Sequence, residues 1–445
     1  MADHDATTMP GSPELSTRAP AMDRRRFLRG LALGGGATVL GGGVLGACGG
    51  GRPDTDGSSP WSQLVPADAT TPMPAAAGPA GAAALADRTL VLIELRGGND
   101  GLDTLVPVGD PRYLDLRGDL AVAVGDTLAI DDEVGLNPML AGMHARGIAV
   151  VEGVGMVTPD LSHFESSRRW WQGDMTGTGT DDTGFLGRLC DALSGDEPVT
   201  GLAIGEASSP YLRSRRAVTL GMTDLHGTGW LSSDDPYVLA ARSGLDTMIA
   251  AGGSGLDATV RANTARALEF VDVVAGLPEH ETDHYPGGYL SESLRACARL
   301  LGSGLGVRVL HVAWGDFDTH ADHRGNHDYQ LQQLDAAVSA FCLDLEDLGL
   351  ADSTLIATAS EFGRRPEANA GGTDHGTASC MLLAGPVAAG RHGEAPSLGD
   401  LDDDGNMAAT VTMDEYYATL CEEWFGVPTD EVLLAPATPI GGVIA

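Results

Sequence analysis

Four short apolar runs set the strongest constraint on the fold of this chain. They are TLVLIEL (89–95), IAVVEGV (148–154), VRVLHVA (307–313) and TLIATA (354–359). Each has the length and composition of a strand that is buried on both faces. Between the last two runs, apolar side chains recur every three or four residues over 329–348, which predicts an amphipathic helix. Buried strands that alternate with helices predict an α/β fold with a mostly parallel central sheet and helices on both faces.

Two further segments complete the predicted organisation. Residues 414–425 have the pattern of another helix, capped from Thr412. Residues 202–277 interrupt the alternation with turns and one helix near 262–274, so we interpret them as an insertion over the active face. With 445 residues, the chain is long enough for one large domain or a domain with insertions.

The polar residues that follow the strands are the candidates for function, because α/β sheets bind ligands beyond the carboxyl ends of their strands. The first run leads into RGGNDG (96–101), where the glycines allow a tight turn that projects the side chain of Asp100. A carboxylate in this position is a hard oxygen ligand for a metal ion. An Asn-Asp-Gly turn without any ligand explains the same residues equally well.

The second run is followed by TPDLSHFE (158–165), in which Ser162 and Glu165 form the S-x-x-E pattern of a capping box. A helix is therefore expected to begin at Ser162. The unpaired N–H groups of a helix start attract anions, so the hydroxyl of Ser162 is a candidate nucleophile. Thr158 is the alternative nucleophile, and His163 is either a ligand or a packed ring.

The third run precedes WGDFDTHADHRGNHD (314–328), in which aspartates alternate with three histidines. Mixed carboxylate and imidazole groups are a ligand set for zinc, manganese or iron. Asp318 and His320 are the first candidates because they lie nearest the strand end. A solvated polar loop is the competing interpretation.

The fourth run leads into SEFGRRPEANAGGTDHGTAS (360–379), which combines an acid, two arginines and a late histidine. Glu361 is expected at the strand end, Arg364 offers a guanidinium group to an anion, and His375 follows a double glycine. A loop with a satisfied histidine would explain His375 alone, but the other strand ends favour a metal site.

Taken in order, GGNDG, SHF, DTHADH, SEFGRR and GGTDHGT resemble a bacterial family exported by the twin-arginine route, the domain-of-unknown-function 1501 family. That family lies within the alkaline phosphatase and sulfatase superfamily, whose members place two metals around a Ser, Thr or formylglycine nucleophile. The resemblance covers residues 88–445 and implies an alkaline-phosphatase-like domain that hydrolyses phosphate or sulfate esters.

The resemblance also implies roles for single residues. Ser162 would be the nucleophile, and Arg96 or Arg364 would clamp the substrate anion. One divalent metal would be held by Asp318, His320 and His375, and a second by Asp100 and Glu361.

One position departs from the superfamily pattern. Active members commonly carry Asp-His at the fourth strand end, where this chain has Glu361-Phe362. Phenylalanine cannot coordinate a metal. The second site would therefore either be weaker and richer in oxygen, suited to Mg, Mn or Ca, or be empty, and Zn is the other candidate metal of the protein. The alternative function is therefore an envelope lipoprotein that has lost catalysis and serves as a binding or scaffolding protein.

The first 87 residues predict export. MDRRRFLRG (22–30) and the Gly-rich apolar run after it resemble a twin-arginine signal, and LGAC (45–48) resembles a lipobox with Cys48 as the lipid-modified residue. Residues 1–48 are thus expected to be a signal peptide and 49–87, rich in Gly, Pro, Ala and Ser, a flexible linker. The expected partner is the twin-arginine translocase, and the expected location is the cell envelope, lipid-anchored at the outer face of the cytoplasmic membrane, or secreted.

The charge of the chain excludes one class of partner. The formal net charge is −35 at pH 7. Nucleic-acid binding needs a basic face, so we expect no nucleic-acid partner. The expected substrate is a small anionic ester or an envelope glycan.

Overall fold

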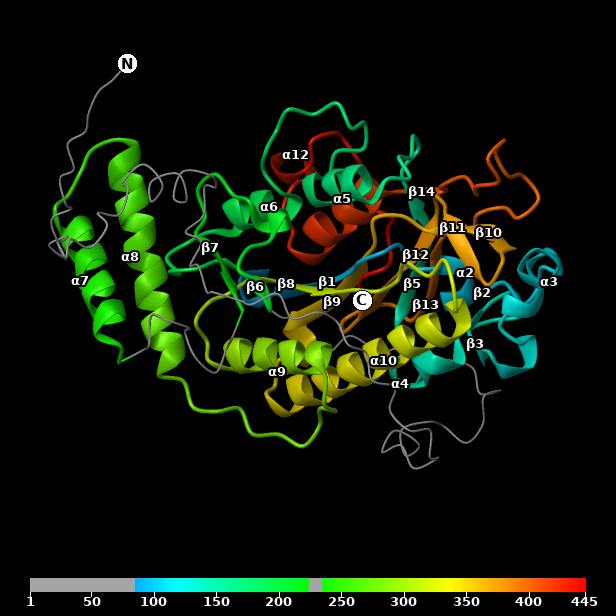
Figure 1. The fold of residues 1–445 in the computed structure, drawn as a ribbon, viewed down its shortest axis with the longest axis horizontal. Coiled ribbons are helices and arrows are strands. Elements are labelled where there is room, and N and C mark those ends of the chain that lie inside the picture. The colour runs from blue at the N-terminus through cyan, green and yellow to red at the C-terminus, as the bar shows by residue number, and fades with distance from the viewer. Residues whose placement is uncertain (1–84, 224–233) are drawn as a thin grey trace, which may run out of the picture. The chain divides into compact units, whose positions relative to one another are not determined.

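The computed structural model describes residues 85–223 and 234–445, and these residues surround a nine-stranded sheet. The strand order is β13-β5-β12-β9-β1-β8-β6-β7, with β14 paired to β5 (Figure 1). The strands are β1 Thr89–Leu95, β5 Ala149–Gly155, β6 Gly201–Ile204, β7 Thr219–Met222, β8 Val309–Trp314, β9 Thr354–Ala359, β12 Ser379–Ala384, β13 Gly390–Gly393 and β14 Val411–Thr412. Only β12 runs antiparallel to its neighbours in the described sheet, so the predicted mostly parallel sheet is confirmed.

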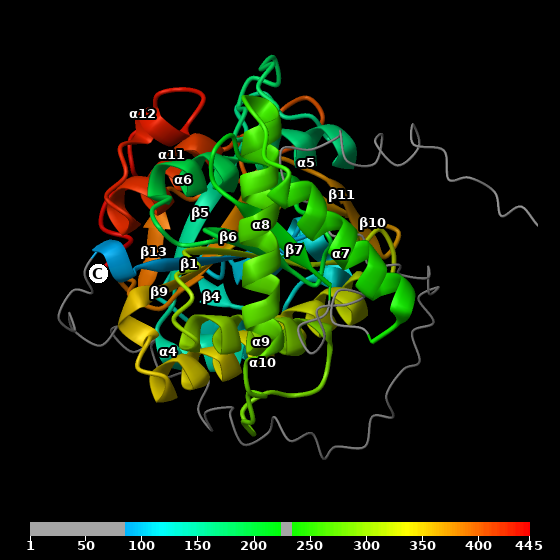
Figure 2. The ribbon, with the colours of Figure 1, turned by 90° about the vertical axis from the view of Figure 1, so that its left-hand side faces the viewer.

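Helices cover both faces of the sheet, as predicted. One layer contains α4 Ala141–Arg146, α9 Tyr289–Gly302 and α10 His323–Asp347, and the other contains α5 His163–Gln172, α6 Phe185–Leu193, α11 Met413–Ala418 and α12 Thr429–Val432 (Figures 1 and 2). The helix α8 Leu256–Ala275 stands beside the β7 end of the sheet (Figure 1). Along β1, Val91 and Ile93 pack into the first layer, while Leu90 and Leu92 pack into the second. Successive side chains of a strand point to opposite faces, which explains why a strand buried on both faces is apolar throughout.

The predicted strands agree closely with the structure. The runs 89–95 and 354–359 coincide with β1 and β9, and the other two are displaced from β5 and β8 by one or two residues. The expected cap at Thr412 is confirmed, because its side chain accepts from the backbone N–H of Glu415 while the Glu415 carboxylate accepts from the backbone of Thr412. None of the helices in the described ranges is both long and apolar enough to cross a membrane.

The interpretation of residues 202–277 as an insertion is wrong for its first part. β6 and β7 extend the main sheet beyond β8, and α8 packs Phe270 and Val274 into the same core. These strands contain four residues each, too few to give a long apolar run that the sequence pattern could reveal.

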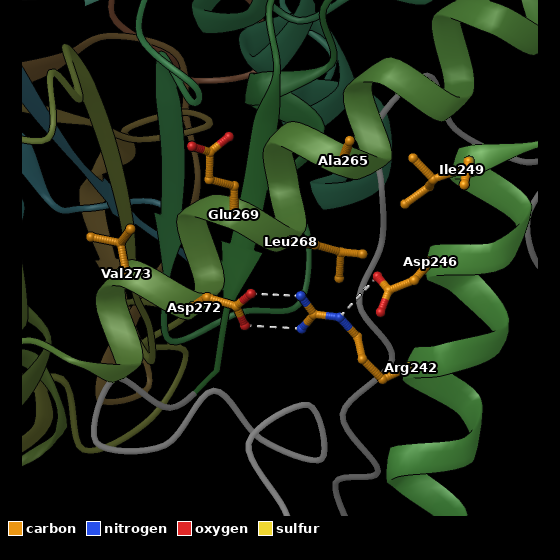
Figure 3. A pocket seen from close by; sticks show the side chains of 9 residues that line it. Arg242, Asp246, Ile249, Ala265, Leu268, Glu269, Asp272 and Val273 are labelled. Atoms are coloured by element: carbon orange, nitrogen blue, oxygen red, sulfur yellow. Dashed lines mark hydrogen bonds and ion pairs between the residues drawn. The ribbon is translucent and has the colours of Figure 1, made fainter. Parts of the chain in front are cut away.

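The helix α7, Pro236–Ala250, packs beside α8 at the β7 end of the sheet and has no buried residue (Figures 1 and 2). Arg242 of α7 joins the two helices by donating to both carboxylate oxygens of Asp272 on α8, at 3.0 and 2.6 Å (Figure 3). This exposed pair contributes little to stability because water screens both charges.

Smaller elements shape the edge of the sheet where the candidate residues lie. They are α2 Gly101–Thr104, α3 Arg112–Arg117, the sheet of β2 Leu105–Val106, β4 Gly135–Leu136 and β3 Leu128–Ala129, and the hairpin of β10 Arg364–Asn369 and β11 Gly372–His375. The predicted signal peptide (1–48) and nearly all of the predicted linker (49–87) lie outside the described residues. Leu85–Asp87 form a short 3-10 turn directly before β1.

Candidate metal centre

Three imidazole rings converge on the carboxylate of Asp318, which lies in the loop between β8 and α10. The Nε2 atoms of His320 and His375 lie 3.0 and 3.2 Å from Asp318 Oδ1, and Nε2 of His163 lies 3.3 Å from Asp318 Oδ2. His163, Asp318 and His375 each offer a ligand atom within 4.8 Å of the others. Three of the predicted ligands, Asp318, His320 and His375, are therefore brought together.

The second nitrogen of each ring faces an acceptor. Nδ1 of His375 donates to the carbonyl of Leu161 at 2.7 Å, Nδ1 of His163 lies 3.0 Å from Glu361 Oε1, and Nδ1 of His320 lies 3.3 Å from Asp374 Oδ1. A proton held on Nδ1 leaves the lone pair on Nε2. This is how histidine ligands of metals are usually oriented, with the non-ligating nitrogen bonded to a carboxylate or a carbonyl.

The Nε2 atom of His163 is buried and has no hydrogen-bond partner within the described residues. A buried polar atom without a partner costs free energy unless something else satisfies it. Since this atom faces Asp318 and lies in the same ligand group as His375, the donor set fits a divalent metal of the zinc or manganese type.

Glu361 supports His163 and does not share a ligand group with Asp100. Its side chain is 6% exposed, and Oε1 accepts from the backbone N–H of Gly97 at 2.7 Å as well as facing His163. The contact with Glu361 raises the pKa of His163, although partial burial acts in the opposite direction. Among the described residues, Asp100 belongs to the ligand group of Asp103 and His323, and Glu361 belongs to neither candidate group, so the second metal site of Asp100 and Glu361 stays a prediction.

Arg364 is buried behind Asp318. Its guanidinium group donates to Asp318 Oδ1 at 2.8 Å, to the carbonyls of Thr373 and Phe317 at 3.0 Å, and to the carbonyl oxygens of the Gly97-Gly98 turn. Burial alone would raise the pKa of Asp318, but the hydrogen bond from Arg364 outweighs it and lowers the pKa to about 2. In this geometry Arg364 orients Asp318. The role predicted for Arg364, contact with a substrate anion, is less favoured because its guanidinium group already donates to these protein oxygens. Arg96, the other predicted clamp, is paired with Glu94 and Glu206.

Phe362 stabilises the orientation of two of the rings. It is 2% exposed, and its centroid lies 4.9 Å from that of His163 and 4.5 Å from that of His375. Gly98 has a φ of +82°, and a Cβ there would lie 2.2 Å from the Phe362 ring, so both the backbone and the ring require glycine. The residue that departs from the superfamily pattern is therefore part of the wall of the site.

Asp100 forms a buried ion pair with Arg117. Arg117 of α3 donates to both of its oxygens, at 2.7 and 2.6 Å, and both side chains are fully buried. Asp100 also caps α2 by accepting from the N–H groups of Leu102 and Asp103. Asp100 thus has the role of a turn and cap residue, and its charged partner is a guanidinium group and not the metal ion expected from the sequence.

Asp100, Asp103 and His323 form a second group of potential ligands, and all three are buried. Arg117 supplies one positive charge to the two carboxylates of this group. Tyr113 donates to Asp103 at 2.8 Å, and His323 Nε2 lies 2.8 Å from the other Asp103 oxygen. The carboxylate oxygens of this group therefore already have partners within the protein.

The dense run of histidines at 320–327 is divided between these two clusters. α10 begins at His323, six residues before the predicted start at Tyr329. The loop ends at the preceding residue, Asp322, which has a φ of 50° in the left-handed region. His323 and His327, one helical turn apart, stack at 5.0 Å and face the Asp103 network. Burial and the nearby His323 lower the pKa of His327 to about 3, so this ring is neutral at pH 7.

Ser162 occupies the N-cap position of α5, as predicted, but the capping box is not formed. Its side chain makes no capping hydrogen bond, and Glu165 pairs with Arg168 and Arg169 at 2.6 and 3.0 Å. Ser162 is exposed and lies between two residues that contact the cluster, since Leu161 accepts from His375 and His163 faces Asp318. Thr158 is also exposed, and the choice between the two hydroxyls stays a prediction.

Two residues of the cluster are not identified by the sequence pattern. The pattern allows His163 to be either a ligand or a packed ring, and it does not distinguish Asp374, which lies beside His320, as a site residue. The available signal for His163 was its place directly after Ser162 at a helix start, eight residues beyond β5.

The fold and the cluster together define an α/β protein with a histidine- and carboxylate-rich site beyond the carboxyl ends of β8 and β9. The chain belongs to the family described as "Protein of unknown function (DUF1501)", whose model matches residues 140–424. This confirms the family indicated by the motifs. No curated protein matches the sequence.

Several solved structures are similar to this chain at low identity. The lipoteichoic acid synthase LtaP from Listeria monocytogenes is 8% identical with a TM-score of 0.37, over 84% of this chain and 80% of that one. The C-terminal periplasmic domain of EcEptC from Escherichia coli, in complex with Zn, is 9% identical with a TM-score of 0.35, over 80% and 92%. A TAB5 alkaline phosphatase mutant with Mg bound is 12% identical with a TM-score of 0.29, over 68% and 93%.

Replacing Glu361 by Gln is expected to weaken metal binding by roughly 10- to 100-fold, the usual effect of losing a carboxylate that orients a histidine ligand. The amide still fills the space of the carboxylate but holds the Nδ1 proton of His163 less strongly. Competition with a chromogenic chelator would measure the change. The control is Glu367→Gln. Glu367 lies on β10, in the hairpin that follows Glu361, and belongs to neither candidate ligand group. An unchanged affinity in Glu361→Gln would show that His163 needs no such support.

Proposed function

We propose that this protein is an exported, metal-dependent hydrolase of phosphate or sulfate esters, with Ser162 as its nucleophile. The observation that carries the proposal is the convergence of three Nε2 atoms on Asp318, each with its Nδ1 atom directed at an acceptor. The family membership and the order of the strand-end motifs support it.

The donor set favours zinc or manganese over magnesium or calcium, because imidazole nitrogen predominates over oxygen. His163, Asp318 and His375 would hold the ion, with His320 beside them. A bound metal ion lowers the pKa of a nearby hydroxyl and stabilises negative charge on the reacting ester. A single metal centre is proposed, because Arg117 supplies the positive charge at Asp100.

The protein itself would position the substrate. The first N–H groups of α5 have no partner within the helix, so the helix start offers donors to an anionic ester next to the Ser162 hydroxyl. Ser162 would attack the phosphorus or sulfur atom in line with the ester oxygen, whose bond breaks as the bond to Ser162 forms, and the serine proton would pass to the departing alkoxide. Water would then hydrolyse the seryl ester and release the inorganic anion. Arg364 keeps Asp318 ionised and oriented during this step.

We further propose that the protein reaches the cell envelope by the twin-arginine route and is anchored to the membrane through lipid at Cys48. The support is the sequence alone, namely Arg24-Arg25 before an apolar run and the LGAC motif. The translocase would be its transient partner, and a small anionic ester or an envelope glycan its substrate.

The direct test is metal analysis of the purified protein together with assays on aryl phosphates and aryl sulfates, with zinc, manganese or magnesium added. We expect about one bound zinc or manganese ion per chain and hydrolysis that a chelator abolishes and added metal restores. Metal binding without hydrolysis of any ester would favour the alternative of a binding or scaffolding lipoprotein. Absence of metal under all of these conditions would refute the proposed centre.

Ser162→Ala is expected to abolish hydrolysis while metal content stays unchanged, because the hydroxyl is the attacking group and no ligand of the centre is altered. The loss should reach roughly 10³-fold or more, as for other enzymes that lose a covalent nucleophile. Thr158→Ala is the matched variant on the same loop and should keep most of the activity. The reverse result would transfer the role of nucleophile to Thr158.

A further inference from the structure

A cavity lies on the β5 and β13 side of the sheet, outside the candidate metal centre. Its volume is about 610 Å³, within the range of small-molecule sites. Its walls come from α2, β5, β12, β13 and the loops around 107–112 and 395–398. No residue of either candidate ligand group lines it, so this cavity is not part of the proposed hydrolase site.

Most of the cavity wall is apolar. Leu102, Leu398 and Met407 form one side and belong to a small buried cluster, and Leu105 and Val134 continue it. An apolar wall of this kind accommodates the hydrocarbon body of a ligand, because burying it removes apolar surface from water.

Another part of the lining carries an excess of negative charge. Glu152 of β5 is 5% exposed, and its Oε1 atom accepts from Nε of Arg391 at 2.6 Å. The same guanidinium group also pairs with Glu133 at 2.6 Å and with Asp131 at 3.2 Å. Three carboxylates therefore share one cation.

The carboxylate of Glu152 can accept a further hydrogen bond. Arg391 contacts its Oε1 atom, and within the described residues no hydrogen bond reaches Oε2. The remaining charged residues of the lining, Asp110 and Arg112, pair with each other at 2.7 Å and neutralise each other. A carboxylate oxygen that accepts no hydrogen bond from the protein can accept one from a ligand, and a donor that also carries positive charge makes the stronger bond.

We propose that this cavity binds a single-chain amphiphile with a primary ammonium group, with the hydrocarbon chain on the apolar wall and the ammonium group on Glu152. The proposal rests on the cavity, its apolar lining and the charge at Glu152. It is independent of the proposed hydrolysis.

Octylamine is the probe, with octanoate and 1-octanol as matched ligands that differ only in the head group. Calorimetry on the purified full chain at pH 7 should show octylamine binding at least ~10-fold more tightly than either of the others, equivalent to ~1.4 kcal/mol. Equal affinities for the three, or no heat of binding for octylamine at millimolar concentration, would overturn the proposal.

Two variants locate the site. Ala395 is exposed and lines the cavity, so Ala395→Trp should fill the mouth and abolish octylamine binding without altering thermal unfolding. Ala262→Trp on α8, exposed and outside the lining, should bind as the wild type does. Glu152→Gln should remove the preference of amine over alcohol. Retained octylamine binding in Ala395→Trp would place the ligand elsewhere and refute this site.

Discussion

Asp318→Asn is expected to eliminate the bound metal and to lower ester hydrolysis by roughly 10³-fold or more, because a metal ion at such a site supplies several kcal/mol of transition-state stabilisation. Asp318 is the one group that all three imidazole Nε2 atoms approach. The amide keeps the size of the carboxylate but removes its charge, so the cluster would contain no anionic ligand. Metal content by mass spectrometry and activity on an aryl ester measure the two effects.

Asp316→Asn is the matched control for this experiment. Asp316 lies two residues earlier in the same loop, is exposed, and belongs to neither ligand group. It adopts a positive φ of 78°, a conformation that asparagine tolerates. This variant should keep both metal and activity. If Asp318→Asn bound metal as tightly as Asp316→Asn, the ion would be held elsewhere and the assignment of the centre would be wrong.

Arg117→Ala is expected to destabilise the protein by about 3–5 kcal/mol, the usual cost of removing one partner of a buried ion pair. The change would leave Asp100 and Asp103 ionised in the core without their cation. Denaturation by urea, followed by circular dichroism, measures the free energy of unfolding. The control is Arg146→Ala, whose exposed pair with Glu346 is expected to contribute less than about 1 kcal/mol.

Arg117→Lys provides a second variant in case the alanine variant does not fold. Lysine keeps the charge but cannot donate to both oxygens of Asp100, so its loss of stability should be intermediate. A loss for Arg117→Ala no larger than that for Arg146→Ala would show that the cluster is solvated.

The wild-type protein should retain the contribution of this cluster well into the acid range. Burial would raise the pKa of Asp103, but Arg117 and His323 outweigh it and hold the pKa below its ordinary value. A carboxyl group whose pKa is lowered by folding stabilises the folded state above its unfolded pKa, and this contribution is lost as the pH falls through the lowered value.

Local patterns in the sequence were sufficient for the main sheet and for part of the site. Burial on both faces makes β1 and β9 apolar at every position, so their bounds could be read directly. Asp318, His320 and His375 were found because they follow predicted strands, and parallel strands bring their carboxyl ends to one edge. The short strands β6 and β7 were not predicted, because four residues give no distinctive periodicity.

The partners of Asp100 and Glu361 required the tertiary structure. Both acids were expected to share a metal ion. Asp100 instead forms an ion pair with Arg117, which lies on a short helix without a functional motif. Glu361 instead supports His163, which lies 198 residues away in the sequence. Spacing in a sequence cannot show which side chain a carboxylate meets across such distances.

The sequence by itself determined the α/β architecture, the family and the candidate ligand residues beyond the strand ends, because periodicity and local composition reflect burial within each element. Only the tertiary structure decided which acids bind guanidinium, which orient imidazole, and which face the candidate metal centre. The reason is physical: ionised groups in a protein interior are stabilised by the charges and donors that surround them in space, and those neighbours come from distant segments of the chain.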